Sequence, residues 1–229
     1  MKTMVLAGGV LAAAVLLTGC GLQNIGKPAN QEKVEYTVSD KVVKLRLDSG
    51  SGNTEIREGS GDTVKVVETL KWSSDKPRTE HKVEGGTLVM TYDCPAAMDN
   101  CSVDYKVEVP KGLPLDLETG SGDIALKGVT GPIVASVGSG DLAGTGLLGK
   151  SASVKTGSGD TTLKYAAAPD ALDLVTGSGN SVIQLPGGPY AVQAVADSGD
   201  ATVTVKNDPS ATRKVSVKAG SGDVSVLPG

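Results

Sequence analysis

Acidic side chains follow a Gly-Ser-Gly triplet many times along the chain, and such a series could bind cations. The motif Gly-Ser-Gly-Asp, or a close variant of it, occurs eight times. Its fourth residues are Asn53, Asp62, Asp123, Asp141, Asp160, Asn180, Asp200 and Asp223. If successive copies stack as neighbouring strands, their carboxylates would lie roughly 4.8 Å apart, and Ca²⁺ favours oxygen ligands of this kind. Calcium at Asp123, Asp141 and Asp160 is therefore one hypothesis.

The same motif also suits a turn that holds itself together by hydrogen bonds. Asn53 and Asn180 keep the side-chain oxygen but not the charge. The nine-residue recurrence of calcium-binding repeats occurs only once, between Asn53 and Asp62. Glycine allows the backbone to turn sharply, and an Asp or Asn oxygen can accept hydrogen bonds from the amides of its own turn. We expect this capping role and no required cofactor, with calcium as the alternative.

The three cysteines have two different expected roles. Lys2, an apolar run and Leu17-Thr18-Gly19-Cys20 resemble the signal peptide and lipobox of a bacterial lipoprotein. This resemblance implies a signal peptide over residues 1–19, a lipid on Cys20 and a location outside the cytoplasm, anchored to the cell membrane. Residues 20–33 are polar and contain Gly and Pro, which predicts a flexible tether. Cys94 and Cys101 are expected to form a disulfide in that oxidising location.

Little in the sequence favours catalysis or nucleic-acid binding. The only histidine, His81, lies in a charged segment that we interpret as a surface loop, so no Ser-His-Asp set can be assembled around a buried histidine. The net charge is −4 and basic residues are not clustered, which argues against nucleic acid as a partner. The single tryptophan, Trp72, could contact a ligand, although we favour a role in the core of the cap.

The elements that carry the motifs are short alternating strands. From Asp123 onward the Asp and Asn positions advance by 18, 19, 20, 20 and 23 residues, a period typical of solenoids. Aliphatic residues alternate with polar ones before and after each turn, which predicts strands with one buried face. Antiparallel hairpins could also explain this pattern. We favour an all-β fold in which residues 117–229 form a parallel β-solenoid of about 20-residue coils.

The ends of this solenoid need separate treatment. Residues 34–116 alternate less regularly, and we expect them to form an irregular antiparallel β cap over the first coil. At the other end the segment 224–227 leaves little sequence for a second cap. Residues 34–229 are expected to form one continuous domain.

The repeated Thr-Gly-Ser-Gly-Asp, together with the segments 107–112 (VEVPKG) and 185–192 (LPGGPYAV), resembles the bacterial DUF4097 family over residues 40–227. That resemblance implies a β-solenoid exported to the cell envelope, in a family that carries an adhesin label and has no catalytic motif to transfer. We therefore expect a lipid-anchored, non-catalytic adhesin or envelope-binding module, whose partner is an envelope polymer or protein. The alternatives are a sensory or stress accessory protein that binds another protein, a calcium-stabilised structural repeat and, least favoured, a polysaccharide-cleaving β-helix.

Overall fold

A computed structural model describes residues 30–95 and 101–229 as two facing β-sheets without any helix, and so without a helix able to cross a membrane in that part of the chain. Sheet A contains, in spatial order, β1 (Asn30–Val38), β4 (Val64–Trp72), β7 (Ser102–Val109), β3 (Thr54–Glu58), β9 (Ile124–Lys127), β11 (Leu142–Leu147), β13 (Thr161–Tyr165), β15 (Ser181–Leu185), β19 (Val224–Pro228) and β17 (Ala201–Val203). Sheet B contains β16 (Ala191–Ser198), β18 (Lys214–Ser221), β14 (Ala171–Ser178), β12 (Ser151–Ser158), β10 (Ile133–Ser139), β8 (Leu115–Thr119), β2 (Lys44–Asp48), β6 (Thr87–Asp93) and β5 (Arg78–Glu84).

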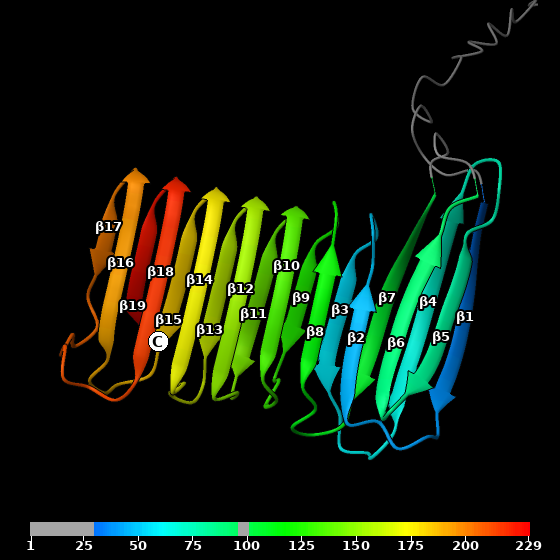
Figure 1. Cartoon of the computed structure of the whole chain (residues 1–229), viewed down its shortest axis with the longest axis horizontal. Helices are drawn as coiled ribbons and strands as arrows, with labels where there is room; N and C mark the ends of the chain where they lie inside the picture. The colour runs from blue at the N-terminus through cyan, green and yellow to red at the C-terminus, as the bar shows by residue number, and fades with distance from the viewer. Residues whose placement is uncertain (1–29, 96–100) are drawn as a thin grey trace, which may run out of the picture.

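The chain winds as the predicted parallel β-solenoid. Each coil places one strand in sheet B and the next in sheet A, and equivalent strands of successive coils pair in parallel (Figure 1). Inward residues of successive coils lie in register, as the row Leu117, Ala135, Val154, Leu174 and Val217 illustrates. All five are at most 2% exposed, so stacking gives every interior coil a dry core that it could not form alone.

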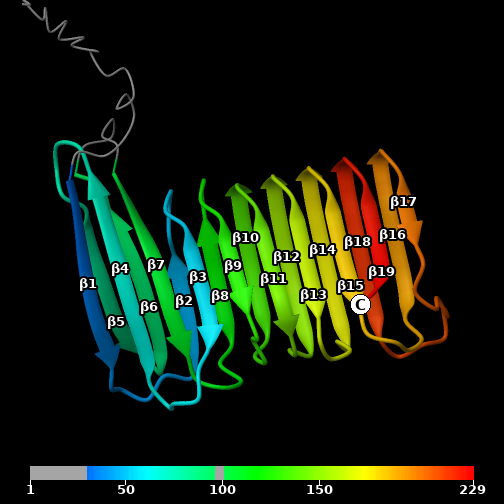
Figure 2. The ribbon, with the colours of Figure 1, turned by 180° about the vertical axis from the view of Figure 1, so that it is seen from behind.

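The spatial order of the coils differs from their order in the chain at both ends. The last coil in the chain, β18–β19, lies between β14–β15 and β16–β17, so β16–β17 forms the end of the solenoid (Figure 2). Likewise, β2–β3 lies between β6–β7 and β8–β9. Residues 224–227, although last in the chain, therefore do not form the end of the solenoid, because β19 pairs on both sides with β15 and β17.

The N-terminal region is only partly the antiparallel cap expected over residues 34–116. The antiparallel pairs are β1 with β4, β4 with β7, and β5 with β6. The pairs of β2 with β6 and of β3 with β7 are parallel, as in the other coils. Residues 30–33, expected in the tether, belong to β1. The signal peptide, Cys20 and the rest of the tether lie outside the described residues. The strands described pair into two continuous sheets around one hydrophobic core.

The corner from sheet B to sheet A requires its two glycines for different reasons. A Cβ at Gly157, the first glycine of its motif, would lie 2.5 Å from the carbonyl oxygen of Gly138 in the preceding coil. The second glycine, Gly159, has a φ of 132°, and a Cβ there would lie 2.0 Å from the carbonyl oxygen of Gly140. The first position therefore excludes a side chain by close packing, while the second excludes it also by conformation.

Candidate functional site

The repeated Asp and Asn residues form a continuous hydrogen-bonded row along one edge of the solenoid, which we name the Asx ladder. Each side-chain Oδ1 accepts the backbone N–H of the equivalent residue in the adjacent coil, as Asp160 accepts that of Asn180 at 2.7 Å. The row runs in the order Asp104, Asn53, Asp123, Asp141, Asp160, Asn180, Asp223 and Asp200, with N···O distances from 2.7 to 3.1 Å. Each side chain except that of Asp200, which ends the row, thus caps the next coil, and the expectation that it caps its own turn is wrong.

The row lacks one residue that the sequence predicted, Asp62, and contains one that the sequence did not predict, Asp104. Asp62 follows β3 at the opposite end of the strands, so its Gly-Ser-Gly-Asp copy joins no ladder despite its identical letters. Asp104 takes the corresponding place from within β7, where its Oδ1 accepts the N–H of Asn53. Only the tertiary order of the coils, which sets β7 beside β3, reveals this exchange.

The ladder provides hydrogen-bond acceptors but no assembled metal site. Across residues 30–95 and 101–229, no group of three or more His, Cys, Asp or Glu side chains is arranged to hold a metal ion. One oxygen of each interior ladder residue is already occupied by a backbone N–H. The geometry therefore favours the hydrogen-bonding hypothesis for Asp123, Asp141 and Asp160 over the calcium alternative.

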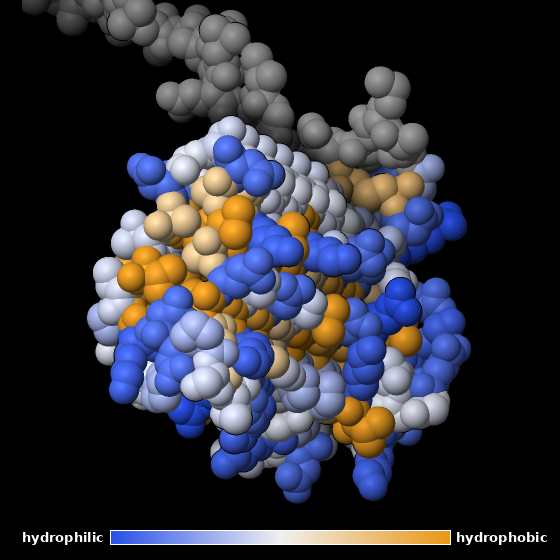
Figure 3. All heavy atoms as spheres, turned by 60° about the vertical axis from the view of Figure 1, so that its left-hand side comes forward, coloured by the Kyte–Doolittle hydropathy of each residue, from blue (hydrophilic) through white to orange (hydrophobic). Residues whose placement is uncertain are grey.

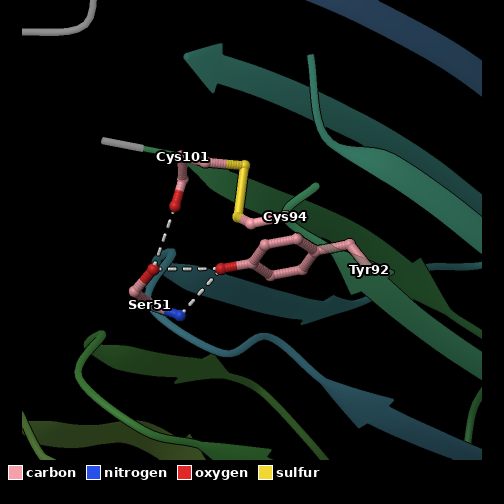
Figure 4. The surroundings of a disulfide bond; sticks show 4 residues. All are labelled: Ser51, Tyr92, Cys94 and Cys101. Carbon is pink, nitrogen blue, oxygen red and sulfur yellow. Dashed lines mark hydrogen bonds between the residues drawn. A yellow bond between two sulfur atoms is a disulfide. The ribbon is translucent and has the colours of Figure 1, made fainter. Parts of the chain in front are cut away.

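The expected disulfide between Cys94 and Cys101 is present and lies against the first repeat turn (Figure 4). The Cys101 carbonyl oxygen accepts a hydrogen bond from Ser51 Oγ at 3.3 Å, and the backbone N–H of Ser51 donates to Tyr92 Oη at 2.9 Å. The disulfide thus ties the end of β6 to the start of β7 beside the corner that carries Asn53.

The aromatic residues are mostly structural. Trp72 is half-buried against the core, with Lys76 Nζ 5.9 Å from its ring centroid, so it is not a freely exposed ligand contact. His81 lies in β5, not in the loop expected, and stacks on Tyr36 with ring centroids 4.1 Å apart. The Tyr36 hydroxyl donates to Oε1 of the buried Glu68 at 2.7 Å. These contacts close the gap between the two sheets at the N-terminal end.

A hollow lies on the outer face of sheet A, over β1, β4, β7 and β3. This groove, of about 520 Å³, is lined by Glu35, Tyr36, Thr37, Glu55, Arg57, Lys65, Val66, Val67, Lys106, Val107 and Glu108. We name it the sheet A groove. Alternation along each strand sends the charged side chains of the groove and the partly exposed Val67 outward, whereas Val66 and Val107 are each 1% exposed and face the core.

Ion pairs hold these charged side chains in place. Lys127 Nζ lies 2.6 Å from Glu55, and its hydrogen bond is the main reason that the pKa of this carboxyl is below its usual value. A hydrogen bond from Lys65, at 3.0 Å, is likewise the main cause of the lowered pKa of Glu108, with Arg57 contributing. Both glutamates therefore stay ionised in the groove at neutral pH.

The two outer faces of the N-terminal region carry opposite charge. The sheet A groove is lined by three cations, Arg57, Lys65 and Lys106, and by three carboxylates, Glu35, Glu55 and Glu108, so that Lys127 at its margin makes the net charge positive. The hollow of about 340 Å³ on sheet B has Arg46 and Lys82 against four carboxylates, Asp48, Glu84, Asp116 and Glu118. A protein with an overall charge of −4 therefore presents one face that favours anionic groups.

Analysis of the sequence missed the sheet A groove. Its signal was the alternation of Lys, Arg and Glu in the segments 54–58, 64–68 and 104–108. Because β7 lies between β4 and β3 in space but follows both in the chain, the sequence could not show that these charges share one surface.

Comparison with known proteins identifies the family of this chain. No curated protein matches the chain. The structure is similar to those of a putative cell adhesion protein from Clostridium sporogenes (16% identity, TM-score 0.46, 87% of this chain and 100% of that chain) and a putative adhesin from Bacteroides fragilis (12%, 0.41, 85% and 97%). A putative lipid binding protein from Parabacteroides distasonis is also similar (15%, 0.35, 89% and 98%). The family model described as Toastrack DUF4097 matches residues 42–227, and the chain belongs to this family.

Proposed function

We propose that this protein is a non-catalytic, adhesin-like binding module of the bacterial cell envelope, anchored by a lipid on Cys20, and that the sheet A groove binds an extended envelope polymer with anionic groups. The observation that carries the proposal is the groove itself, in which the exposed cations Arg57, Lys65 and Lys106 lie around the partly exposed Val67. These cations are at least half exposed, so they can exchange their present partners for a ligand.

The shape of the surface suits a polymer better than a small molecule. The groove is open and continues into the regular outer face of sheet A, whose strands pair in register from β3 through β9 and β11. Long, regular faces of this kind bind extended partners in other solenoid proteins. The proposed anchor is supported by the sequence Leu17-Thr18-Gly19-Cys20.

Co-sedimentation with purified cell-wall material tests the groove. Residues 21–229 should pellet with the wall, saturate with increasing protein, and pellet less as salt is raised, because salt screens contacts with exposed charges. Lys106→Glu should reduce pelleting. The matched control is Lys164→Glu, which makes the same change at an exposed position of β13 on sheet A, outside the groove.

Two results would contradict the proposal. Equal pelleting of the Lys106→Glu and Lys164→Glu variants would exclude the groove as the polymer site. Absence of pelleting by the unaltered protein would exclude a wall polymer and favour the alternative of a protein partner, to be sought by pull-down from membranes. Lipid attachment is tested separately by mass spectrometry of the native protein and of a Cys20→Ala variant.

A further inference from the structure

The coil β16–β17 leaves the solenoid open at the end farthest from β1. The inward residues Val215, Val217 and Ala219 of β18 are at most 3% exposed, whereas the residues in register with them in β16, Val192, Ala194 and Ala196, are only partly buried. Figure 3, in which this end comes forward, shows apolar side chains gathered over it. The inward apolar side chains of β16 therefore have no further coil of the described chain to cover them.

Among the described strands, none pairs with the outer edge of β16 or β17, and residues 206–208 bond to β16 only at its start, where the Tyr190 N–H donates to the Lys206 carbonyl oxygen. The Ala191 N–H donates to the Arg213 carbonyl oxygen, so the backbone groups of the odd-numbered residues of β16 bond to β18. The N–H and C=O groups of its even-numbered residues therefore point away from β18. The side-chain amide of Asn207 pairs with both the N–H and the C=O of Val192. The N–H and C=O groups of Ala194 and Ala196 have no such partner among the described residues. At the corner, the Asp200 carboxylate likewise ends the Asx ladder without accepting a hydrogen bond from any described residue.

An occupant of this end must present two strands, one for each sheet, with apolar side chains between them. Another solenoid end satisfies this requirement. The N-terminal end of a second copy does not, because its edge strands carry charges such as Lys33 in β1 and Glu80 and Lys82 in β5. The stacked Tyr36 and His81 also close the space between its sheets. A head-to-tail fibre is thus disfavoured, and a contact between two like ends closes at two copies.

We propose that the protein forms a tip-to-tip dimer in which β16 pairs antiparallel with β16 of a second copy, around a two-fold axis at Val195. This register sets Ala194 of one copy opposite Ala196 of the other, which pairs the outward N–H and C=O groups of both. It also sets the two Val195 side chains, each 39% exposed, beside each other on the outer face of sheet B.

The charges of the end coil support the antiparallel arrangement. Asp197 and Asp200 lie at the corner that joins β16 to β17, while Lys206 and Arg213 lie at the opposite end of these strands, with Asp208 beside them. A two-fold axis across the strands sets the acidic corner of each copy against the basic end of the other. Stable interfaces contain roughly 20–30 residues from each partner. The end coil and its loop, residues 190–213, are a segment of that size.

Sedimentation velocity of residues 21–229 over a wide range of concentration tests the dimer. We expect a reversible equilibrium between monomer and dimer. Val195→Lys should weaken dimerisation about tenfold or more, because it sets two like charges directly opposite each other across the axis. The matched control is Val175→Lys, since Val175 is 40% exposed on the same face of sheet B but lies in the interior strand β14.

A second variant keeps the test independent of side-chain charge. Ala194→Pro removes an N–H that points away from β18, so the coil keeps its own hydrogen bonds while the edge loses a donor to its partner. Circular dichroism confirms that each variant is folded. A protein that stays monomeric at every concentration, that grows beyond a dimer, or that dimerises equally well with Val195→Lys as with Val175→Lys would overturn the proposal. None of these results depends on the lipid anchor or on the sheet A groove.

Discussion

Two glycines that are indistinguishable in the motif should respond in opposite ways to the same substitution. Gly61 and Gly159 are both the second glycine of a Gly-Ser-Gly-Asp copy. A Cβ at Gly61 would have no atom within 4 Å, because this copy lies outside the stacked corners. A Cβ at Gly159 would lie 2.0 Å from the carbonyl oxygen of Gly140, at a φ of 132°.

The expected loss for Gly159→Ala follows from these two features. Overpacking against a rigid neighbour costs about 1–3 kcal/mol, and a non-glycine residue in such a backbone conformation costs about another 1–3 kcal/mol. The free energy of unfolding should therefore fall by about 2–6 kcal/mol, which lowers Tm by at least about 4 °C in a domain of this size. Gly61→Ala should change stability by less than about 1 kcal/mol, in the stabilising direction if alanine restricts the unfolded chain.

The assay is thermal and urea unfolding of residues 21–229 followed by circular dichroism, with the disulfide intact. The difference between the two variants is the decisive quantity, because both make the same chemical change in the same four-residue motif. If Gly61→Ala lowered Tm as much as Gly159→Ala, the assignment of Gly61 to an open corner would be refuted. If Gly159→Ala melted like the unaltered protein, close stacking of the corners would be refuted.

Three further outcomes test other contacts. Asp160→Ala should lower the unfolding free energy by about 1 kcal/mol, because it leaves the N–H of Asn180 without its protein acceptor. Asp160→Asn keeps an oxygen and should change the unfolding free energy by less than half as much. Urea unfolding distinguishes the two variants. Reduction of the Cys94–Cys101 disulfide should lower the unfolding free energy by about 2 kcal/mol, the value for a short closed loop, measured with and without reductant. Burial raises the pKa of three tyrosines far above the usual value, so their stabilising contribution is full below about pH 10 and is lost as pH rises further. These tyrosines are Tyr36, Tyr105 and Tyr165. The absorbance of phenolate should show that their hydroxyl groups titrate only as the protein unfolds.

The sequence by itself determined the repeating unit. Alternation of aliphatic and polar residues depends only on the two-residue period of a strand, and it identified the inward rows such as Leu117 and Val154 correctly. Gly-Ser-Gly-Asp at intervals near 20 residues identified the corners, and proximity of Cys94 and Cys101 identified the disulfide. These features are local, because each is encoded by residues within one coil.

Only the tertiary structure decided which coil lies beside which. Coils with the same period and the same inward pattern can stack in more than one order, so the sequence could not show that β18–β19 inserts before β16–β17. The same ambiguity concealed the exchange of Asp62 for Asp104 in the Asx ladder and the gathering of charges in the sheet A groove. Strand pairing is a contact between distant segments, and its choice depends on how well whole faces fit, which no short stretch of sequence contains.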